Sequence, residues 1–156
     1  MAGVLAQINA KIGDGSSFVD GDAIAAQAAS DLADCVSVAI YESLIGNEMS
    51  AVGAASPGGV SNLGGGMYEI GVNIPAQFRY SLLPDIYGGV NDMAALFNNG
   101  YSAHPLTVYD INGNVRSSRP FRSPAHFVQR GLQMFAGRGG GDYTVVSTQA
   151  SGRFGG

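Results

Sequence analysis

The sequence predicts an α+β domain in which one long helix packs on a small, mainly antiparallel sheet, accompanied by two shorter helices and glycine-rich arms. Three observations predict this fold: a helical repeat of apolar residues between positions 20 and 45, an alternating apolar segment at 67–74, and the hairpin signal Asn112-Gly113. Because 156 residues suffice for one hydrophobic core but hardly for two, we expect residues 1–156 to form a single domain.

The long helix is expected from about Asp20 to Ile45, where apolar residues recur every three or four positions. Its apolar face consists of Ile24, Ala28, Leu32, Cys35, Val36, Ala39, Ile40 and Leu44. Asp20 or Asp22 can cap the start, and Gly46 followed by Asn47 can end the helix. Its many alanines either let two different partners pack closely against it or simply favour the helical state.

The segments on either side of this helix differ in character. A short apolar stretch at residues 4–12 predicts one or two further helical turns. Residues 51–66 carry no charge and no periodicity, so we expect a flexible arm that becomes ordered only against a neighbouring subunit. Residues 67–74 alternate between apolar and other side chains, and this pattern predicts a half-buried strand.

The second half of the chain alternates short elements with turn signals. A second helix is expected near residues 91–97, followed by a hairpin whose strands, 106–109 and 114–118, flank the Asn-Gly turn. Pro124 can occupy the first turn of a third helix that extends to about Phe135. The segments expected after it are a flexible link at 136–141, a strand at 142–148 and a tail at 149–156.

The composition favours a protein that contacts other proteins over much of its surface. Charged residues make up 13% of the chain, against roughly 25% in typical soluble domains. The net charge of -4 also hides an asymmetry. Residues 1–110 hold eleven of the twelve acidic residues, whereas residues 111–156 hold six of the eight basic ones. The two parts of the chain therefore carry opposite charge.

The sequence contains no recognisable constellation for catalysis. Cys35 is the single cysteine, which excludes an intrachain disulfide and argues for a small core residue. His104 and His126 lack neighbouring ligands at metal spacing, and the glycine runs match no phosphate-binding motif. We therefore predict no enzyme activity, no cofactor and no metal site. The N-terminus lacks a signal-peptide pattern, and no uninterrupted apolar run suits a membrane span.

The most distinctive segment reads Arg116-Ser-Ser-Arg119-Pro120-Phe121-Arg122-Ser-Pro124-Ala125. It resembles the Arg-Pro-Phe-x-x-Pro-Ala ending of the phage tail-completion, or neck, family, whose small members join filled heads to long tails. Residues 93–101 occupy the place where that family has a short apolar segment ending in glycine. The resemblance covers about residues 20–135. It departs at 51–66, where family members commonly carry an Asp-Thr-Gly-x-Leu-type segment.

This resemblance implies a structural virion protein, assembled in the host cytoplasm, that forms a ring in the phage neck or upper tail. Its partners would be copies of itself, the adjacent head-closure protein and a tail-tube or terminator protein, with no membrane contact. A tail-terminator or minor capsid subunit is one alternative. A nucleic-acid-binding module that uses the arginine-rich C-terminal third is another, although the acidic isoelectric point argues against it. An enzyme is the third alternative.

A ring built head to tail needs two different faces, which an acidic and a basic part of one chain can supply. The residues predicted at this subunit interface are Arg116, Arg119, Phe121 and Arg122 on the basic side and Asp31, Asp34 and Glu42 on the acidic side. Phe121 is expected to anchor the third helix, to contact a neighbour, or both. The arginines alternatively face the bore of the ring and make non-specific contact with DNA.

Overall fold

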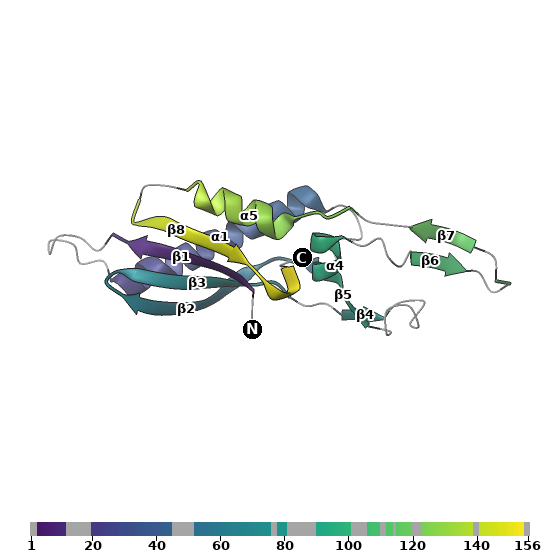
Figure 1. Ribbon diagram of the computed structural model, residues 1–156, viewed down its shortest axis with the longest axis horizontal. Coiled ribbons are helices and arrows are strands. Elements are labelled where there is room, and N and C mark those ends of the chain that lie inside the picture. The colour runs from purple at the N-terminus through teal and green to yellow at the C-terminus, as the bar shows by residue number, and fades with distance from the viewer. Residues whose placement is uncertain are drawn as a thin grey trace.

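The chain folds as a four-stranded antiparallel sheet with two helices on one face and a group of short elements at one end (Figure 1). The computed structural model describes residues 3–11, 20–44, 52–75, 78–80, 90–100, 106–109, 112–113, 115–119, 123–138 and 141–154. Side chains are described for these residues except at 78–80, 90–93, 96, 106–109, 115–119 and 153. The predicted fold class, α+β with one long helix and two shorter ones, is confirmed.

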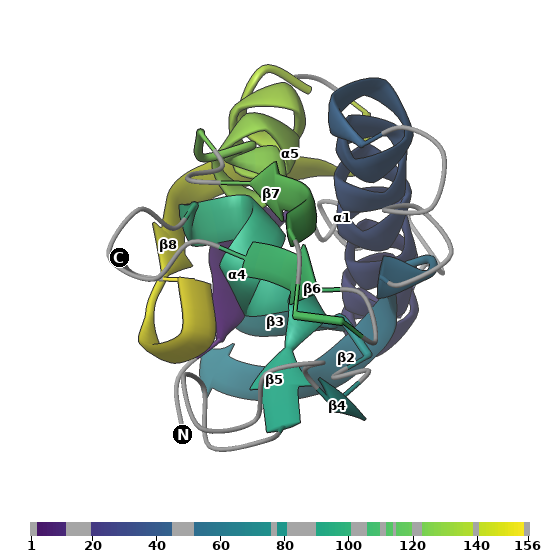
Figure 2. The ribbon, with the colours of Figure 1, turned by 90° about the vertical axis from the view of Figure 1, so that its right-hand side faces the viewer.

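The sheet has the strand order β2-β3-β1-β8, and every neighbouring pair is antiparallel. Its strands are β1 (Val4–Ala10), β2 (Ser56–Gly64), β3 (Met67–Asn73) and β8 (Tyr143–Ala150). Helix α1 (Gly21–Ser43) lies over β2 and β3, and α5 (Phe127–Ala136) lies over β8. Figure 2 shows the two helices side by side on the same side of the sheet, so the core lies between one helical layer and one sheet.

Helix α1 agrees with its sequence prediction. The carboxylate of Asp20 accepts a hydrogen bond from the backbone N–H of Asp22 at 3.0 Å, which caps the start as proposed. The helix ends at Ser43, and the N–H of Leu44 still donates to the carbonyl of Ile40. The predicted apolar face is buried throughout, including the free thiol of Cys35. The proposed stop signal at 46–47 lies outside the described residues.

The short elements extend from the body of the molecule. Strands β4 (Phe78–Tyr80) and β5 (Val90–Asp92) pair with each other and lead into α4 (Met93–Asn99). Strands β6 (Leu106–Tyr109) and β7 (Val115–Arg119) form the hairpin that Asn112-Gly113 predicts, with Gly113 at a φ of +85°. The second helix and the hairpin are therefore confirmed. The hairpin lies beyond α4, away from the four-stranded sheet (Figure 1).

The expectation of a flexible arm at 51–66 is wrong, because most of this segment is the edge strand β2. The structure gives the reason at Gly58, where a Cβ atom would lie 2.8 Å from the carbonyl carbon of Gly71. Glycine is needed there for close approach of the two strands rather than for mobility. Two register shifts in the β2–β3 pair also erase the alternation that marks a strand in the sequence.

Two further expectations at the chain ends are wrong. Residues 4–10 form the strand β1 instead of helical turns, and Val4, Ala6, Ile8 and Ala10 alternate into the core. The expected tail at 149–156 contains the end of β8 and a 3₁₀ turn, η1 (Gly152–Phe154). Phe154 is only 2% exposed, so the C-terminal segment belongs to the core. The expected flexible link at 136–141 begins with the last residue of α5, and residues 139–140 lie outside the described residues.

The two main helices approach closely where they cross. A Cβ atom on Gly131 of α5 would lie 2.7 Å from the Cα atom of Val36 and 2.8 Å from its Cγ2 atom, both on α1. Such distances are shorter than real carbon–carbon contacts, so only glycine fits at this position without displacing a helix. Next to the crossing, the guanidinium of Arg130 donates to the hydroxyl of Ser43 at 3.3 Å.

We expect Gly131→Ala to lower the free energy of unfolding by about 1 to 3 kcal/mol, the cost of overpacking a closely packed core. Alanine normally favours a helix over glycine, so a destabilisation identifies the helix contact as its cause. Gly137→Ala is the matched control, because its Cβ would meet its nearest atoms at 3.6 Å and its φ is -77°. Urea unfolding of the three proteins measures the effect, and a Gly131→Ala protein more stable than the wild type would contradict the prediction.

Candidate functional site

The candidate site is the junction at the base of the β6–β7 hairpin, where α4 meets the start of α5. The N–H of Ala125 donates to the carbonyl of Phe97 at 2.9 Å, and the N–H of His126 donates to the carbonyl of Asn98 at 3.1 Å. Phe97 and Ala125 are both buried. The two segments that carry the sequence resemblance, 93–101 and 116–127, therefore meet at Phe97–Asn98 and Ala125–His126, whereas Arg116 and Arg119 of the second segment belong to strand β7 of the hairpin.

Asn98 holds the start of α5 in place. Its side chain is fully buried, and its Oδ1 atom accepts a hydrogen bond from the N–H of Val128 at 3.0 Å. The residue at the usual capping position, His126, has a left-handed backbone with φ 53° and ψ 34°, and its side chain makes no capping bond. A side chain from α4 thus replaces the local cap. This explains why the helix begins at Phe127 instead of near Pro124.

The C-terminal turn closes the junction from the other side. The ring of Phe154 packs edge-to-face on the ring of Phe127, with 6.2 Å between centroids. The side-chain amide of Gln129 donates to the carbonyl of Phe154 at 2.8 Å. Three segments distant in sequence therefore fix the base from which the hairpin extends.

The basic residues predicted at the interface belong to the hairpin and the segment after it. Arg116 and Arg119 lie on β7, at the end of the molecule beyond α4 (Figure 1), and only their backbone is described. Phe121 and Arg122 lie outside the described residues, as does His104. His126 is exposed, immediately before the first residue of α5.

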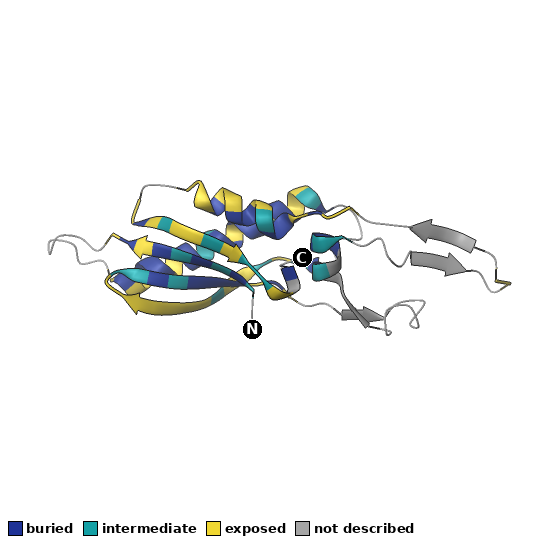
Figure 3. Cartoon of the chain, viewed as in Figure 1, coloured by how far each residue is buried: buried dark blue, intermediate teal, exposed yellow. Residues whose placement is uncertain are grey.

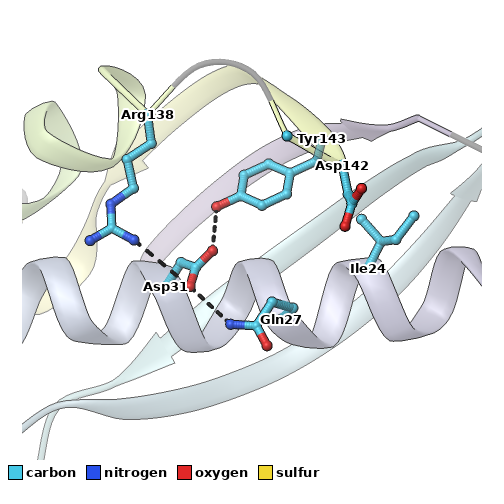
Figure 4. A pocket seen from close by; sticks show the side chains of 7 residues that line it. Ile24, Gln27, Asp31, Arg138, Asp142 and Tyr143 are labelled. Atoms are coloured by element: carbon cyan, nitrogen blue, oxygen red, sulfur yellow. Dashed lines mark hydrogen bonds and ion pairs between the residues drawn. The ribbon is translucent and has the colours of Figure 1, made fainter. Parts of the chain in front are cut away.

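The acidic residues predicted at the interface fall into two groups. Asp34 and Glu42 are exposed on α1. Asp31 is only partly exposed and is bound within its own chain (Figure 4). One carboxylate oxygen accepts from the hydroxyl of Tyr143 at 2.7 Å, and the other accepts from the side-chain amide of Gln27 at 3.0 Å. Asp31 was predicted at the subunit interface; within its own chain, its carboxylate joins α1 to β8.

Arg138 completes this polar group, which we call the Asp31 network. Its guanidinium lies 3.8 Å from the Asp31 carboxylate, and half of the arginine side chain is exposed, so the ion pair contributes little stability. Burial raises the pKa of Tyr143 above its ordinary value, and the hydrogen bond to Asp31 acts in the same direction. The network borders a shallow depression of about 340 Å³ (Figure 4). Its polar groups already bind one another, so the arrangement suits a structural role.

The described residues offer little to a reaction. Burial raises the pKa of the Cys35 thiol, which keeps it protonated and unreactive near neutral pH. Among the residues that the structure describes, no three His, Cys, Asp or Glu side chains are grouped to hold a metal ion. No local sequence pattern marks Asn98, Tyr143 or Phe154 as residues that hold this region together. Their roles depend on contacts with segments far away in the chain, which no local pattern encodes.

Helix α1 is also long and apolar enough to cross a membrane when judged by length and composition alone. However, 56% of its apolar 18-residue window is buried inside the molecule, and the core helices of soluble proteins pass the same test. Its packing on the sheet accounts for its composition. The length and composition of α1 are therefore weak evidence for a membrane span, and the absence of membrane contact stays a prediction.

No family model matches the chain, and no curated protein or solved structure is significantly similar to it. The likeness to the tail-completion family therefore depends on the sequence segments described above and on the contacts that these segments make.

Replacing Tyr143 with phenylalanine removes the hydroxyl that binds Asp31 and keeps the ring, which stacks on Phe135 with 5.8 Å between centroids. We expect the free energy of unfolding to fall by about 1.5 to 3 kcal/mol near neutral pH, as for other hydrogen bonds to charged groups. Tyr41→Phe on α1 is the matched control, because this side chain is 64% exposed. Chemical denaturation of the three proteins measures the difference.

The pH dependence of this difference follows from the raised pKa of Tyr143. A raised pKa in the folded state means that the protonated hydroxyl stabilises the fold below the ordinary value of 10.0. This contribution is lost as the pH rises from that value toward the pKa of the folded state. The stability gap between wild type and Tyr143→Phe should therefore narrow above about pH 10. A gap that stays constant there would show that the hydroxyl does not act through this bond.

Proposed function

We propose that this protein is a non-enzymatic structural subunit that forms a ring in the neck or upper tail of a long-tailed phage and joins head to tail. The observation that carries the proposal is the contact of Phe97 and Asn98, in segment 93–101, with Ala125 and His126, in segment 116–127. These are the two segments that resemble the tail-completion family, and backbone hydrogen bonds join them at Phe97–Ala125 and Asn98–His126. Segments that act as one unit in a family are expected to meet in space.

The arrangement of the molecule supports an assembly role. The four-stranded sheet with α1 and α5 forms a closed core, and the hairpin extends from one end of it (Figure 1). Asn98 and Phe154 anchor the base of this hairpin in buried surroundings. An arm fixed at its base and extending beyond the core is suited to reach a neighbouring subunit. The low charge content of the chain favours protein contacts in the same way.

The charge asymmetry suggests how neighbours meet. We place Arg116, Arg119 or Arg122 of one subunit against carboxylates on α1 of the next subunit. Asp34 and Glu42 are the better partners, since Asp31 is already bound within its own chain. The adjacent head-closure protein and a tail-tube or terminator protein would occupy the two sides of the ring. A tail-terminator or minor capsid subunit is the alternative with the same kind of contact.

Native mass spectrometry and negative-stain images of the purified chain test this proposal. We expect a closed oligomer with a central opening, in which copies of the chain contact one another head to tail. The concentration of six of the eight basic residues in 111–156 favours a second candidate, a DNA-binding module. A monomer whose DNA affinity falls steeply with salt would support that module and contradict the ring.

Charge reversal distinguishes an interface role of the arginines from a role in the bore. We expect Arg119→Glu to reduce assembly, because it places a negative charge against the acidic face of the neighbour. A second change, Asp34→Arg, should partly restore assembly in light scattering. Lys11→Glu is the control, because this exposed lysine lies next to β1 in the body. Normal assembly of Arg119→Glu together with weaker retention of DNA would assign the arginines to the channel.

A further inference from the structure

We propose that the four-stranded sheet continues from one subunit to the next, with β2 of one copy pairing antiparallel with β8 of a second copy. This inference rests on the proposed assembly into a ring and specifies a contact within it. It concerns the two outer strands of the sheet, which we call the sheet edges: β2 (Ser56–Gly64) and β8 (Tyr143–Ala150).

Both sheet edges lack charge. Neither SPGGVSNLG in β2 nor YTVVSTQA in β8 contains an acidic or basic residue. Among the residues that the structure describes, no strand pairs with the outer side of either edge. The side chains of β2 are exposed along nearly its whole length (Figure 3). Exposed edges present a row of backbone N–H and C=O groups, and proteins that avoid pairing commonly protect them with lysines or other charges.

Both edge strands contain irregularities that hinder pairing with another strand, but each also has a regular stretch. Pro57 lacks a donor, and β2 has register shifts after Pro57 and after Asn62. The pairing of β8 with β1 shifts once, between Gln7 and Ile8. Between these irregularities the strands are regular at Val60–Asn62 in β2 and at Ser147–Ala150 in β8. These two stretches are where we place the backbone hydrogen bonds between subunits, with Leu63 and Val146 directly beside them in the sequence.

The sheet edges also carry exposed apolar side chains. Val60 and Leu63 on β2 are 41% and 52% exposed, and Val146 on β8 is 54% exposed. They make up three of the six large apolar side chains that are exposed in the described part of the chain. Edge pairing would bury apolar surface on both strands while satisfying backbone groups that no strand in the described part of the chain pairs with. Both gains point to a protein strand as the occupant.

The strand directions favour a second copy of this chain as that occupant. All three strand pairs of the sheet are antiparallel, so β2 and β8 run in opposite directions. Two copies placed side by side in the same orientation therefore bring β2 next to β8 as an antiparallel pair, the pattern already present within the sheet. A symmetric contact between two β2 strands would leave β8 uncovered. The head-to-tail contact covers both uncharged edges in every subunit with a single kind of interface, whereas symmetric pairing would need a separate β2–β2 and β8–β8 interface.

Lysine substitutions that block one edge at a time test this contact. Leu63→Lys places a charge on β2, and Val146→Lys places one on β8. Met134→Lys is the control, because Met134 is an exposed apolar residue on the helix α5 and belongs to neither edge strand. Native mass spectrometry should find each edge variant as a monomer and the control at the wild-type mass.

The decisive measurement is an equimolar mixture of the two edge variants. The Leu63→Lys protein keeps a free β8, and the Val146→Lys protein keeps a free β2, so the mixture should form dimers and nothing larger. Dimer formation also demonstrates that both variants are folded. Backbone amides of residues 60–62 should exchange with deuterium more slowly in this dimer than in the monomeric variants. Ser61→Lys is a second variant that blocks β2. Position 61 lies opposite Glu69 on β3, so the new lysine faces an opposite charge, which favours folding of this variant.

Three results would overturn the inference. The first is wild-type assembly of either edge variant, and the second is a Val146→Lys protein that dimerises alone, which indicates β2–β2 pairing. The third is a mixture that stays monomeric while the control assembles. Failure of the proposed ring and failure of the edge contact give different results. If the wild type forms rings and both lysine variants still form them, the edge contact alone is refuted. If the wild type forms open chains that either lysine substitution breaks, the ring alone is refuted. A monomeric wild type would refute both.

Discussion

The close approach of α5 to α1 at Gly131 is the constraint on which the rest of the fold depends. Without a side chain at this position, the backbone of α5 contacts Val36 directly, and both helices fit on one face of a four-stranded sheet. The position of α5 in turn determines where β8 enters the sheet. The hydroxyl of Tyr143, at the start of β8, donates a hydrogen bond to Asp31 on α1. Helix α1 therefore contacts both α5 and the strand that follows α5.

The start of α5 fixes the position of the hairpin base relative to the core. Asn98 on α4 satisfies the N–H of Val128, and Phe154 covers Phe127. Since both contacts are buried, the start of α5, the end of α4 and the C-terminal turn form one rigid junction. The direction in which the hairpin leaves the body is therefore set by packing within the core. In the proposed ring, such an anchored hairpin would meet a neighbour in a defined orientation without first losing much conformational freedom.

The sequence predicted the elements whose pattern has one interpretation and missed those whose pattern has two. The apolar repeat of α1 and the alternation of β3 are long and regular, and the structure confirms both. Strand β1 was mistaken for helical turns because Val4, Ile8 and Ile12 also fit a helical spacing. Strand β2 was mistaken for an arm because its glycines permit close strand contact as readily as mobility. In the candidate site, the resemblance identified the segments around Phe97 and Ala125. It could not identify Asn98 as the cap of α5, because that bond joins residues thirty positions apart.

The place of β1 in the sheet affects how the chain folds while it is being synthesised. This first strand lies between β3 and β8, so one of its two sides is satisfied only by the strand synthesised after all the others. Pairs such as Val4 with Ala150 have a very large sequence separation, which gives the fold a high contact order and slows its formation. A ribosome-bound chain can form α1, β2 and β3 but leaves one side of β1 open until β8 emerges. During this interval the nascent protein is vulnerable to mispairing with other strands, and completion of the sheet is the step that removes this hazard.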